Sequence, residues 1–545
     1  LLIKKLLFLQ KMHRLRLKNY GLALFLLFAA FVPLFYSLYT EHIWEDYYIT
    51  YKFSRNLADG YGLVYFPGEK AVHGFTSPLG VLLPALTYLI CRSDSMALWL
   101  FRIFFGIPCF IAAIYMLYKT SEKVFKDYPH LKFLCPLFLV FEVKSVMFSV
   151  NGMETALMLF FVSWLIKIFI YKDWDWRKIG FCSAALMWTR PDSCIYIGGI
   201  IISFLIFFPE LRKSQSITFI KSIILGIILY MPWFLFAWFY FGSPIPHTII
   251  AKNAAFGGIF FSNLTIRDLY AIFSTFIRIP VMIYYPVYPQ FGSWPFIIYV
   301  FSAFLGYFAI FATIAPLKQD FKPEVKALSL FFIILCAYFA FIRVPYPWYF
   351  PPAGIPSYLV ISAIFIELTR RWALRHHFLY AFFLISISGF LLIFFLDTER
   401  MKAQQEIVEN GNRMKIGLWL NKNSNPGDRI FLECLGYIGY FSGRKVLDYP
   451  GLVSPEVVKI IQNKKNGYVI SVEELAPEWV VAREFEARNL IKSDFFRRNY
   501  YPVAEFNVRD KISELNYLFG LNYLYYDSFF IVYKKLQREK GENNE

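Results

Sequence analysis

Long apolar runs alternate with short polar segments over the first four hundred positions of the chain. Each run approaches or exceeds the roughly 20 residues that a helix needs to cross the hydrocarbon core of a bilayer. The pattern therefore predicts a polytopic α-helical membrane protein. The clearest runs are residues 21–39, 96–118, 131–150, 155–171, 217–240, 295–316, 327–342, 350–366 and 378–396.

Basic residues collect between alternate runs, which indicates the orientation of the chain. They lie before the first run and in the segments 119–132, 172–178, 210–213, 318–326 and 370–377. The positive-inside rule assigns these segments to the cytoplasm, with the first run as an uncleaved helix. With a short span between residues 178 and 190, we expect eleven spans and a first outer loop at 41–78. The apolar stretch 79–91 is short enough for an interfacial or re-entrant helix.

The chain changes character after about residue 396. Turn signals, two β-prone runs (429–433 and 479–482) and an amphipathic stretch (455–462) replace the apolar runs. We therefore predict a transmembrane domain over residues 1–396 and an extracytoplasmic α/β domain over residues 397–545.

Composition narrows the class of protein further. The chain is 57% hydrophobic and 21% aromatic, and its net charge of +17 is spread in short clusters between apolar runs. Such clusters report membrane topology, so we predict no nucleic-acid partner. The seven cysteines indicate no disulfide framework. Zinc-spaced ligands, a nucleophile elbow and a Walker loop are not found in the sequence, so a soluble nucleotide-sugar or ATP enzyme is unsupported.

The unusual ionisable residues of the membrane region gather in segments that we assign to the outer face. Charges at a membrane boundary are costly to desolvate, so they should face water or a polar cavity. Their convergence predicts an active cavity on the outer side. The residues are Glu45, Asp46, Arg55, His73, Glu154, Arg190, Asp192, His247, Lys252 and Arg343.

The adjacent acids Glu45 and Asp46 follow the first span. Neighbouring residues on a helix point about 100° apart, so only one of them can face a given ligand atom. One acid could act as a general base and the other as a metal ligand or as an acceptor for a sugar hydroxyl. The alternative is that both are solvated charges that cap a helix.

The cationic candidates have structural alternatives as well. Arg190 is suited to binding a phosphate, but it could simply pair with Asp192 and close the turn around Pro191. His247, Lys252 and Arg343 are candidate phosphate contacts that could each be interfacial anchors. The chemistry that remains is transfer from a lipid-linked substrate with an anionic group, such as a polyprenyl-phosphate sugar.

Residues 45–70 and 73–79 resemble the first outer loop of C-type (GT-C) glycosyltransferases. The nearest subgroup is that of the mycobacterial terminal β-arabinofuranosyltransferase and its bacterial relatives. Further similarity lies at residues 151–155, 189–192, 246–252, 348–352, 435–448 and 451–456.

This resemblance implies an inverting transferase whose first-loop carboxylates lie near the acceptor. Glu45 and Asp46 match an Asp-Asp pair of the family, with Glu45 longer by one methylene. That leaves open which acid is the base and whether the two hold a divalent cation. Arg55, Glu69 and His73 lie in the same motif and are expected to bind substrate.

The sequence thus predicts a multi-pass glycosyltransferase of the inner (plasma) membrane. It would move a sugar from a polyprenyl-phosphate donor to an envelope glycan or lipid, with catalysis by Asp46 or Glu45. The substrate-binding candidates are Arg55, Glu69, His73, Glu154, Arg190, Asp192, His247, Lys252 and Arg343. Alternatives are a lipid A or protein modifier or a glycan ligase of the same fold, and a secondary transporter.

Overall fold

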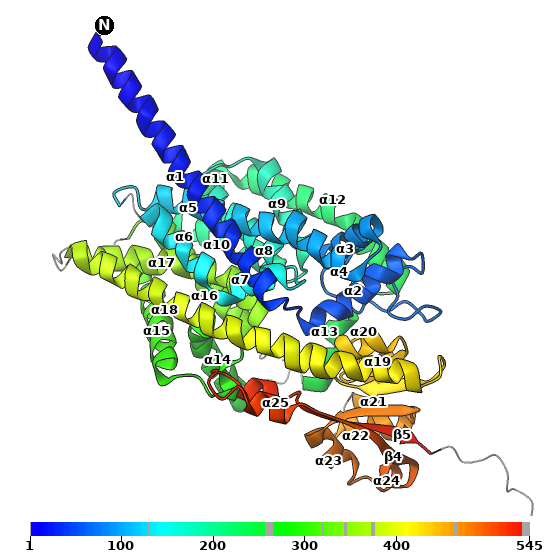
Figure 1. Cartoon of the computed structure of the whole chain (residues 1–545). Helices are drawn as coiled ribbons and strands as arrows, with labels where there is room; N and C mark the ends of the chain where they lie inside the picture. The colour runs from blue at the N-terminus through cyan, green and yellow to red at the C-terminus, as the bar shows by residue number, and fades with distance from the viewer. Residues whose placement is uncertain are drawn as a thin grey trace, which may run out of the picture.

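In the computed structural model, the chain forms a helical bundle with a small α/β domain at one end (Figure 1). The structure describes residues 2–128, 131–256, 265–318, 321–342, 346–371, 376–462, 464 and 466–536, with side chains from residue 20 onward except those of Phe256 and His376. The helices of the first part are α1 (Leu2–Thr40), α2 (Glu45–Ala58), α3 (Pro78–Cys91), α4 (Asp94–Phe101), η1 (Arg102–Gly106), α5 (Ile107–Val124), α6 (Leu131–Phe141), α7 (Val143–Val150), α8 (Thr155–Tyr171), α9 (Trp176–Thr189), α10 (Ser193–Phe207), α11 (Leu211–Ser214), α12 (Ser216–Phe241), α13 (His247–Phe256), α14 (Ile266–Tyr284), η3 (Pro289–Phe291), α15 (Phe296–Lys318), α16 (Pro323–Phe341), η4 (Pro347–Tyr349) and α17 (Phe350–Arg371).

Seven helical segments in the described residues are long and apolar enough to cross a membrane, which makes the chain a multi-pass membrane protein. The pair α6–α7 adds an eighth candidate that is bent by 62°. Helices α8, α9 and α10 have only 17, 14 and 15 residues. The predicted apolar runs are thus helical, while the number of eleven spans stays a prediction. The seven segments are Tyr20–Thr40, Asp94–Val124, Ser216–Phe241, Phe296–Lys318, Pro323–Phe341, Pro347–Arg371 and His377–Asn423.

The bend between α6 and α7 is built around Glu142. Its carboxylate accepts hydrogen bonds from the backbone N–H groups of Lys144 and Ser145, which caps α7 and ends the preceding helix. The ammonium of Lys144 lies 2.8 Å from the same carboxylate and also donates to the carbonyl of Ile283. This buried pair is therefore satisfied within the protein and explains the break in an otherwise apolar run.

One rod joins the bundle to the α/β domain. Helix α18 (His376–Ala403) continues without interruption as the π-helix η5 (Gln404–Arg413) and as α19 (Met414–Asn423). Figure 1 shows this rod in yellow, running along the bundle to the base of the sheet. It crosses residue 396, the predicted domain boundary, which stays a prediction.

The α/β domain contains a five-stranded sheet in the order β2-β1-β3-β5-β4. Strands β2, β1 and β3 are parallel, and β5 pairs antiparallel with both β3 and β4. Seven short helices accompany it in the described residues: α20 (Tyr437–Ser442), α21 (Pro455–Ile461), α22 (Gly467–Leu475), α23 (Glu484–Leu490), α24 (Asp494–Asn499), α25 (Arg509–Ser513) and α26 (Asn522–Tyr525). The strands are β1 (Arg429–Leu432), β2 (Lys445–Asp448), β3 (Trp479–Arg483), β4 (Tyr500–Asn507) and β5 (Phe529–Lys535). The two β-prone runs of the sequence are β1 and β3, and the amphipathic stretch is α21, so the predicted α/β character is confirmed.

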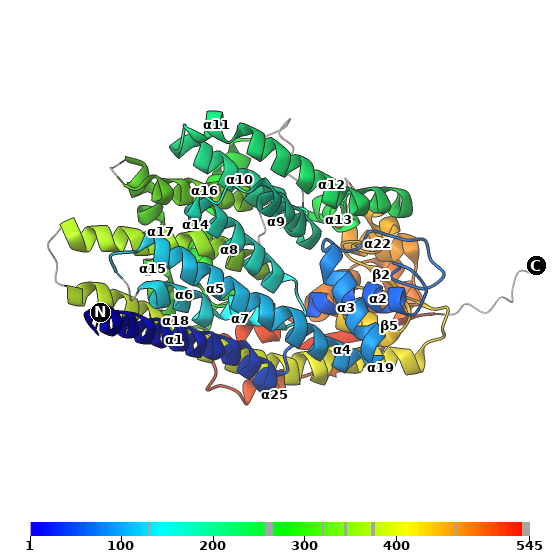
Figure 2. The same ribbon diagram turned by 90° about the horizontal axis from the view of Figure 1, so that it is seen from above.

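Alternation along the strands attaches this sheet to the first outer loop. Ile430 and Leu432 of β1 point into an apolar cluster with Ile49 and Phe53 of α2, whereas Phe431 points into a cluster on the other face. The sheet is thus buried on both faces, and one face packs on the segment that contains Glu45 and Asp46. Figure 2 shows the domain and α2 together at one end of the bundle, and the start of α1 at the other end.

Candidate active site

The first turn of α2 is held in place by the residue that precedes it. The backbone N–H of Trp44 donates to the carbonyl of Asn151, and its indole contacts the rings of Phe148, Tyr288 and Trp348. Two acids in the first turn also interact favourably with the N-terminal end of the helix dipole. The position of the acidic pair is therefore fixed by packing against the bundle rather than by a mobile loop.

Asp46 lines a small cavity between the bundle and the α/β domain. Further polar groups of its wall come from segments far apart in the chain, among them Glu154 before α8, Arg190 after α9, and Thr248 and Lys252 of α13. The volume is about 70 Å³, room for about two water molecules at roughly 30 Å³ each. This volume is far below the range of about 300–1,000 Å³ that is usual for ligand sites, so a sugar phosphate needs the cavity to widen. Four predicted site residues, Asp46, Glu154, Arg190 and Lys252, meet here.

The guanidinium of Arg190 is bound by two carboxylates. Its Nη1 lies 2.9 Å from Glu154 Oε1, and its Nε lies 2.9 Å from Asp192 Oδ1. The cation also lies over the ring of Tyr349, with 4.2 Å to the ring centroid. Burial disfavours the charged form, but Asp192, Tyr349 and Glu154 outweigh it and raise the pKa of Arg190. Arg190 is therefore a permanent cation that already orients two acids.

Lys252 is the cation of the cavity that forms no ion pair with a described residue. Its ammonium lies over the ring of Tyr346, with 4.4 Å between Nζ and the ring centroid. Burial lowers the pKa of Lys252, but Tyr349, Tyr346 and Asp46 more than offset this and raise it. Lys252 therefore stays protonated and is available for an anionic ligand.

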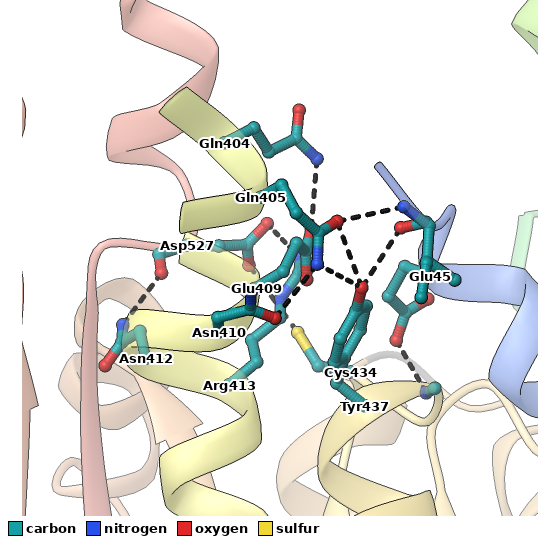
Figure 3. Close-up of polar contacts among 12 residues, drawn as sticks. Glu45, Gln404, Gln405, Glu409, Asn410, Asn412, Arg413, Cys434, Tyr437 and Asp527 are labelled. Atoms are coloured by element: carbon teal, nitrogen blue, oxygen red, sulfur yellow. Dashed lines mark hydrogen bonds and ion pairs between the residues drawn. The ribbon is translucent and has the colours of Figure 1, made fainter. Parts of the chain in front are cut away.

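The two acids of α2 lie in different surroundings. Glu45 Oε1 accepts a hydrogen bond of 2.6 Å from the backbone N–H of Gly436, at the start of α20 (Figure 3). A Cβ atom at Gly436 would lie 2.1 Å from the carbonyl oxygen of Glu45, so only glycine permits this approach. Asp46 instead faces the cavity and forms no ion pair with a described residue.

Burial raises the pKa values of both acids. For Glu45, Arg413 opposes the shift and the charge of Asp46 adds to it. For Asp46, Lys252 is the main opposing charge. Because the two groups titrate as a pair, protons leave them at higher pH than they leave an ordinary carboxyl group.

A buried polar network lies behind Glu45 and was not predicted from the sequence. Arg413 of η5 pairs with Glu409, 2.8 Å away, and with Asp527 (Figure 3). Asp527 also lies 2.6 Å from Arg483 at the end of β3. The Glu409–Arg413 spacing is a recognisable helical pair. Asp527 follows Arg413 by more than a hundred residues and gives no such signal. This network fixes the rod to the sheet behind the candidate site.

The remaining predicted residues lie apart from Asp46. Arg55 pairs with Asp94, with 3.0 Å between Nη1 and Oδ2, and is half-exposed. His73, His247 and Glu69 line a separate cavity of about 380 Å³, where Glu69 pairs with Lys445. The roles of these residues in substrate binding stay predictions. Arg343 lies outside the described residues.

The described part of the site offers little to a metal ion. Among the residues that the structure describes, groups of three or more His, Cys, Asp and Glu side chains able to hold a metal are not found. Glu45, one of the two predicted ligands, is engaged by a backbone N–H donor. Glu45 and Asp46 thus form a pair of acids that is not joined by a third such side chain among the described residues.

Comparison with known proteins adds a partial family match. The model of a domain of unknown function, DUF8728, matches residues 400–526. This range begins inside α18 and includes most of the sheet domain, so the end of the rod belongs to the same sequence unit. The sequence matches none of the curated proteins at a significant level.

Solved structures share the fold over nearly the whole chain. The archaeal oligosaccharyltransferase AglB from Archaeoglobus fulgidus, in complex with an inhibitory peptide and a dolichol-phosphate, is 14% identical with a TM-score of 0.53, over 96% of this chain and 75% of that chain. ArnT from Cupriavidus metallidurans in the apo state is 10% identical with a TM-score of 0.54, over 95% and 98%. ArnT bound to undecaprenyl phosphate is 11% identical with a TM-score of 0.53, over 96% and 99%. The chain therefore has the GT-C fold that its first outer loop indicates.

Proposed function

We propose that this protein is a glycosyltransferase that moves a sugar from a polyprenyl-phosphate donor to a hydroxyl group of an envelope glycan or lipid. The observation that carries the proposal is the meeting of Asp46 and Lys252 in one cavity of a GT-C fold. Two of the solved structures with this fold contain a polyprenyl phosphate, dolichol-phosphate or undecaprenyl phosphate. A carboxylate beside a protonated lysine suits this reaction, because the carboxylate can accept the proton of the acceptor hydroxyl and the lysine can stabilise the phosphate that leaves.

Asp46 is the general base in this proposal. It accepts the proton of the acceptor hydroxyl, whose oxygen forms the new bond to the anomeric carbon. A raised pKa brings a carboxylate nearer to neutral pH, where a general base is most effective. Glu45 is engaged by Gly436 and holds α2 against the α/β domain instead.

Lys252 stabilises the leaving group. As the bond between the anomeric carbon and the phosphate oxygen breaks, the electron pair leaves with the polyprenyl phosphate, and negative charge grows on that oxygen. A fixed cation at this position stabilises the transition state more than the ground state. Arg190, bound by Glu154 and Asp192, positions these acids beside the donor. A base on one side of the sugar and the phosphate on the other inverts the anomeric centre.

The cavity and the α/β domain face the extracytoplasmic side of the inner membrane in this proposal. The basic segments 119–132 and 172–178 favour the opposite end of the bundle for the cytoplasm. Alkaline phosphatase fused after residue 536 should be active in cells, and green fluorescent protein at the same place should stay dark. The reverse pattern would contradict this orientation.

A reconstituted assay tests the reaction itself. Proteoliposomes receive the lipid extract of a host strain that lacks this gene, as the donor pool, and its delipidated envelope, as the acceptor. Mass analysis follows the glycan and the released polyprenyl phosphate. Asp46→Asn should lower the rate of sugar transfer by about 100- to 10,000-fold, which is the usual contribution of a general base to the rate.

The control for this substitution is Glu41→Gln, which changes an exposed acid close to α2. It should leave transfer unchanged. If wild-type protein moved no sugar, or if Asp46→Asn transferred at the wild-type rate, the proposal would be wrong.

A further inference from the structure

A second and larger cavity lies in the α/β domain. Its volume is about 960 Å³, at the upper end of the range of about 300–1,000 Å³ that is usual for ligand sites. It is lined by four aromatic rings, those of Tyr449, Tyr468, Phe485 and Tyr526. The reaction described above uses none of these side chains.

The sheet topology places this cavity where open α/β sheets usually bind ligands. Strand β1 lies between β2 and β3 in the sheet. After β1 the chain forms β2 on one side of it, and later it forms β3 on the other side. Ligands of open α/β sheets bind at such a switch point, outside the carboxyl ends of the strands. Glu433 directly follows β1 and Arg483 ends β3, and both line this cavity.

The wall of the cavity suits a neutral ligand with many hydroxyl groups. The formal charges of its wall sum to zero, because it contains three acidic and three basic side chains: Glu433, Glu473, Glu486, Lys464, Arg483 and Lys492. Arg483 is neutralised within the protein by Glu433, Glu486 and Asp527, at 2.6, 2.9 and 2.6 Å. Aromatic faces with dispersed hydrogen-bonding groups are the surface that a sugar ring packs against, because its C–H faces are apolar and its edges polar.

Tyr468 adds an independent observation on the wall of the cavity. Its hydroxyl is buried and has no hydrogen-bond partner among the described residues, although a buried hydroxyl is normally paired. Tyr468 lies on α22 in the wall of the cavity. A rotation of the ring toward the cavity would bring this hydroxyl to a ligand hydroxyl and satisfy it.

The cavity also adjoins the candidate active site. Lys252 lines the small cavity and Ala255 lines the large one, three residues apart on one face of α13. Burial is the main reason that the pKa values of Glu45 and Asp46 are raised, and the charge of Glu433 raises both further. Glu433 of the large cavity is thus close enough to the proposed base for its charge to act on it.

We infer that the cavity at the carboxyl ends of β1 and β3 binds a neutral oligosaccharide, the acceptor, and presents its terminal hydroxyl toward Asp46. This inference rests on the proposed function and makes it specific: the acceptor is a glycan rather than a lipid. The aromatic rings hold the sugar faces, and Tyr468 contacts a ring hydroxyl.

Equilibrium binding tests this site without depending on catalysis. Full-length Asp46→Asn protein in detergent is titrated with fluorescently labelled glycans released from the envelope of a host strain lacking this gene, separated into neutral and acidic fractions. Asn489→Trp on α23 places a bulky ring in the cavity wall, and Arg488→Trp adds the same ring to the exposed neighbouring position.

The neutral fraction should bind the parent protein and the Arg488→Trp variant equally. Asn489→Trp should weaken binding by about tenfold or more, and Tyr468→Phe by about two- to tenfold for one lost hydrogen bond. Tyr468→Phe removes a hydroxyl without a partner, so its melting temperature should stay unchanged, which separates binding from folding.

Three results would overturn the inference: no binding of neutral glycans to the parent, stronger binding of the acidic fraction, or equal binding by Asn489→Trp and Arg488→Trp. The proposed function is judged separately by transfer in proteoliposomes. If the protein transferred sugar normally but bound no glycan at this cavity, the proposed function would stand and the proposed acceptor site would be wrong.

Discussion

The carboxylate of Glu45 accepts a 2.6 Å hydrogen bond from the backbone N–H of Gly436, a residue 391 positions later in the chain. Its neighbour Asp46 faces the cavity with Lys252. Two adjacent acids thus have different surroundings: Glu45 joins the first outer loop to the α/β domain, and Asp46 is the general base that we propose. The following predictions separate these roles.

Gly436→Ala should break the junction between α2 and the α/β domain. The new Cβ would lie 2.1 Å from the Glu45 carbonyl oxygen, so one of the two segments must move. We expect a lower melting temperature and a large loss of sugar transfer. Gly427→Ala is the matched control, because its Cβ would meet no atom of a described residue within 4 Å. Equal effects of the two substitutions would show that the close approach at Gly436 is unimportant.

The rate of transfer should fall as the pH is lowered, with an acid limb above the ordinary carboxyl value of 3.8. Burial raises the pKa of Asp46, so it is protonated, and inactive as a base, at a pH where an exposed aspartate is still charged. Because Lys252 opposes this shift, Lys252→Met should move the acid limb to higher pH. A pH–rate profile of both proteins measures this. An acid limb at the ordinary value in wild type would contradict the assignment.

Lys252→Met should lower the rate of the chemical step by about 100-fold or more, the usual loss when one charge-stabilising group is removed from a transition state. Lys252→Arg should retain more activity, since it keeps the positive charge. Single-turnover release of polyprenyl phosphate is the measurement. Lys422→Met, on the exposed face of α19, should have no effect. If Lys252→Arg were as inactive as Lys252→Met, packing against Tyr346 rather than charge would explain the loss.

The melting temperature should rise with pH in the window set by Lys52. Burial lowers the pKa of this amine to about 7, while the unfolded chain keeps a value near 10.5. Between these values the unfolded state binds a proton that the folded state has released, so stability increases as the pH rises from about 7. Lys52→Met should flatten this dependence, and Lys70→Met, at an exposed position, should not. An unchanged slope in Lys52→Met would contradict the prediction.

The sequence predicted those parts of the fold that depend on local pattern. Apolar run lengths located the helices, and short β-prone runs located β1 and β3. In β1 the period of two places Ile430 and Leu432 on one face and Phe431 on the other. Charge asymmetry between loops predicted that Asp46, Glu154, Arg190 and Lys252 would share one end of the bundle, and they line one cavity.

The sequence did not predict which charged side chains form ion pairs within the protein. Arg190 was expected to be either a phosphate contact or the partner of Asp192, and the structure adds a second carboxylate, Glu154. Such pairing depends on distances of a few ångströms between segments that no periodicity relates. The same holds for Arg413 and Asp527, whose contact arises only when the rod and the sheet dock.

The unbroken helix from His376 to Asn423 limits how proteins of this kind can be rebuilt. Because each residue advances an α-helix by about 100°, inserting or deleting one position before Arg413 would rotate everything beyond it and turn that side chain away from Asp527. Chimaeras that graft a foreign recognition module onto this chain should therefore succeed only when the joint preserves helical phase. A flexible linker between the two parts usually makes such exchanges easy, but in this chain a continuous helix takes its place.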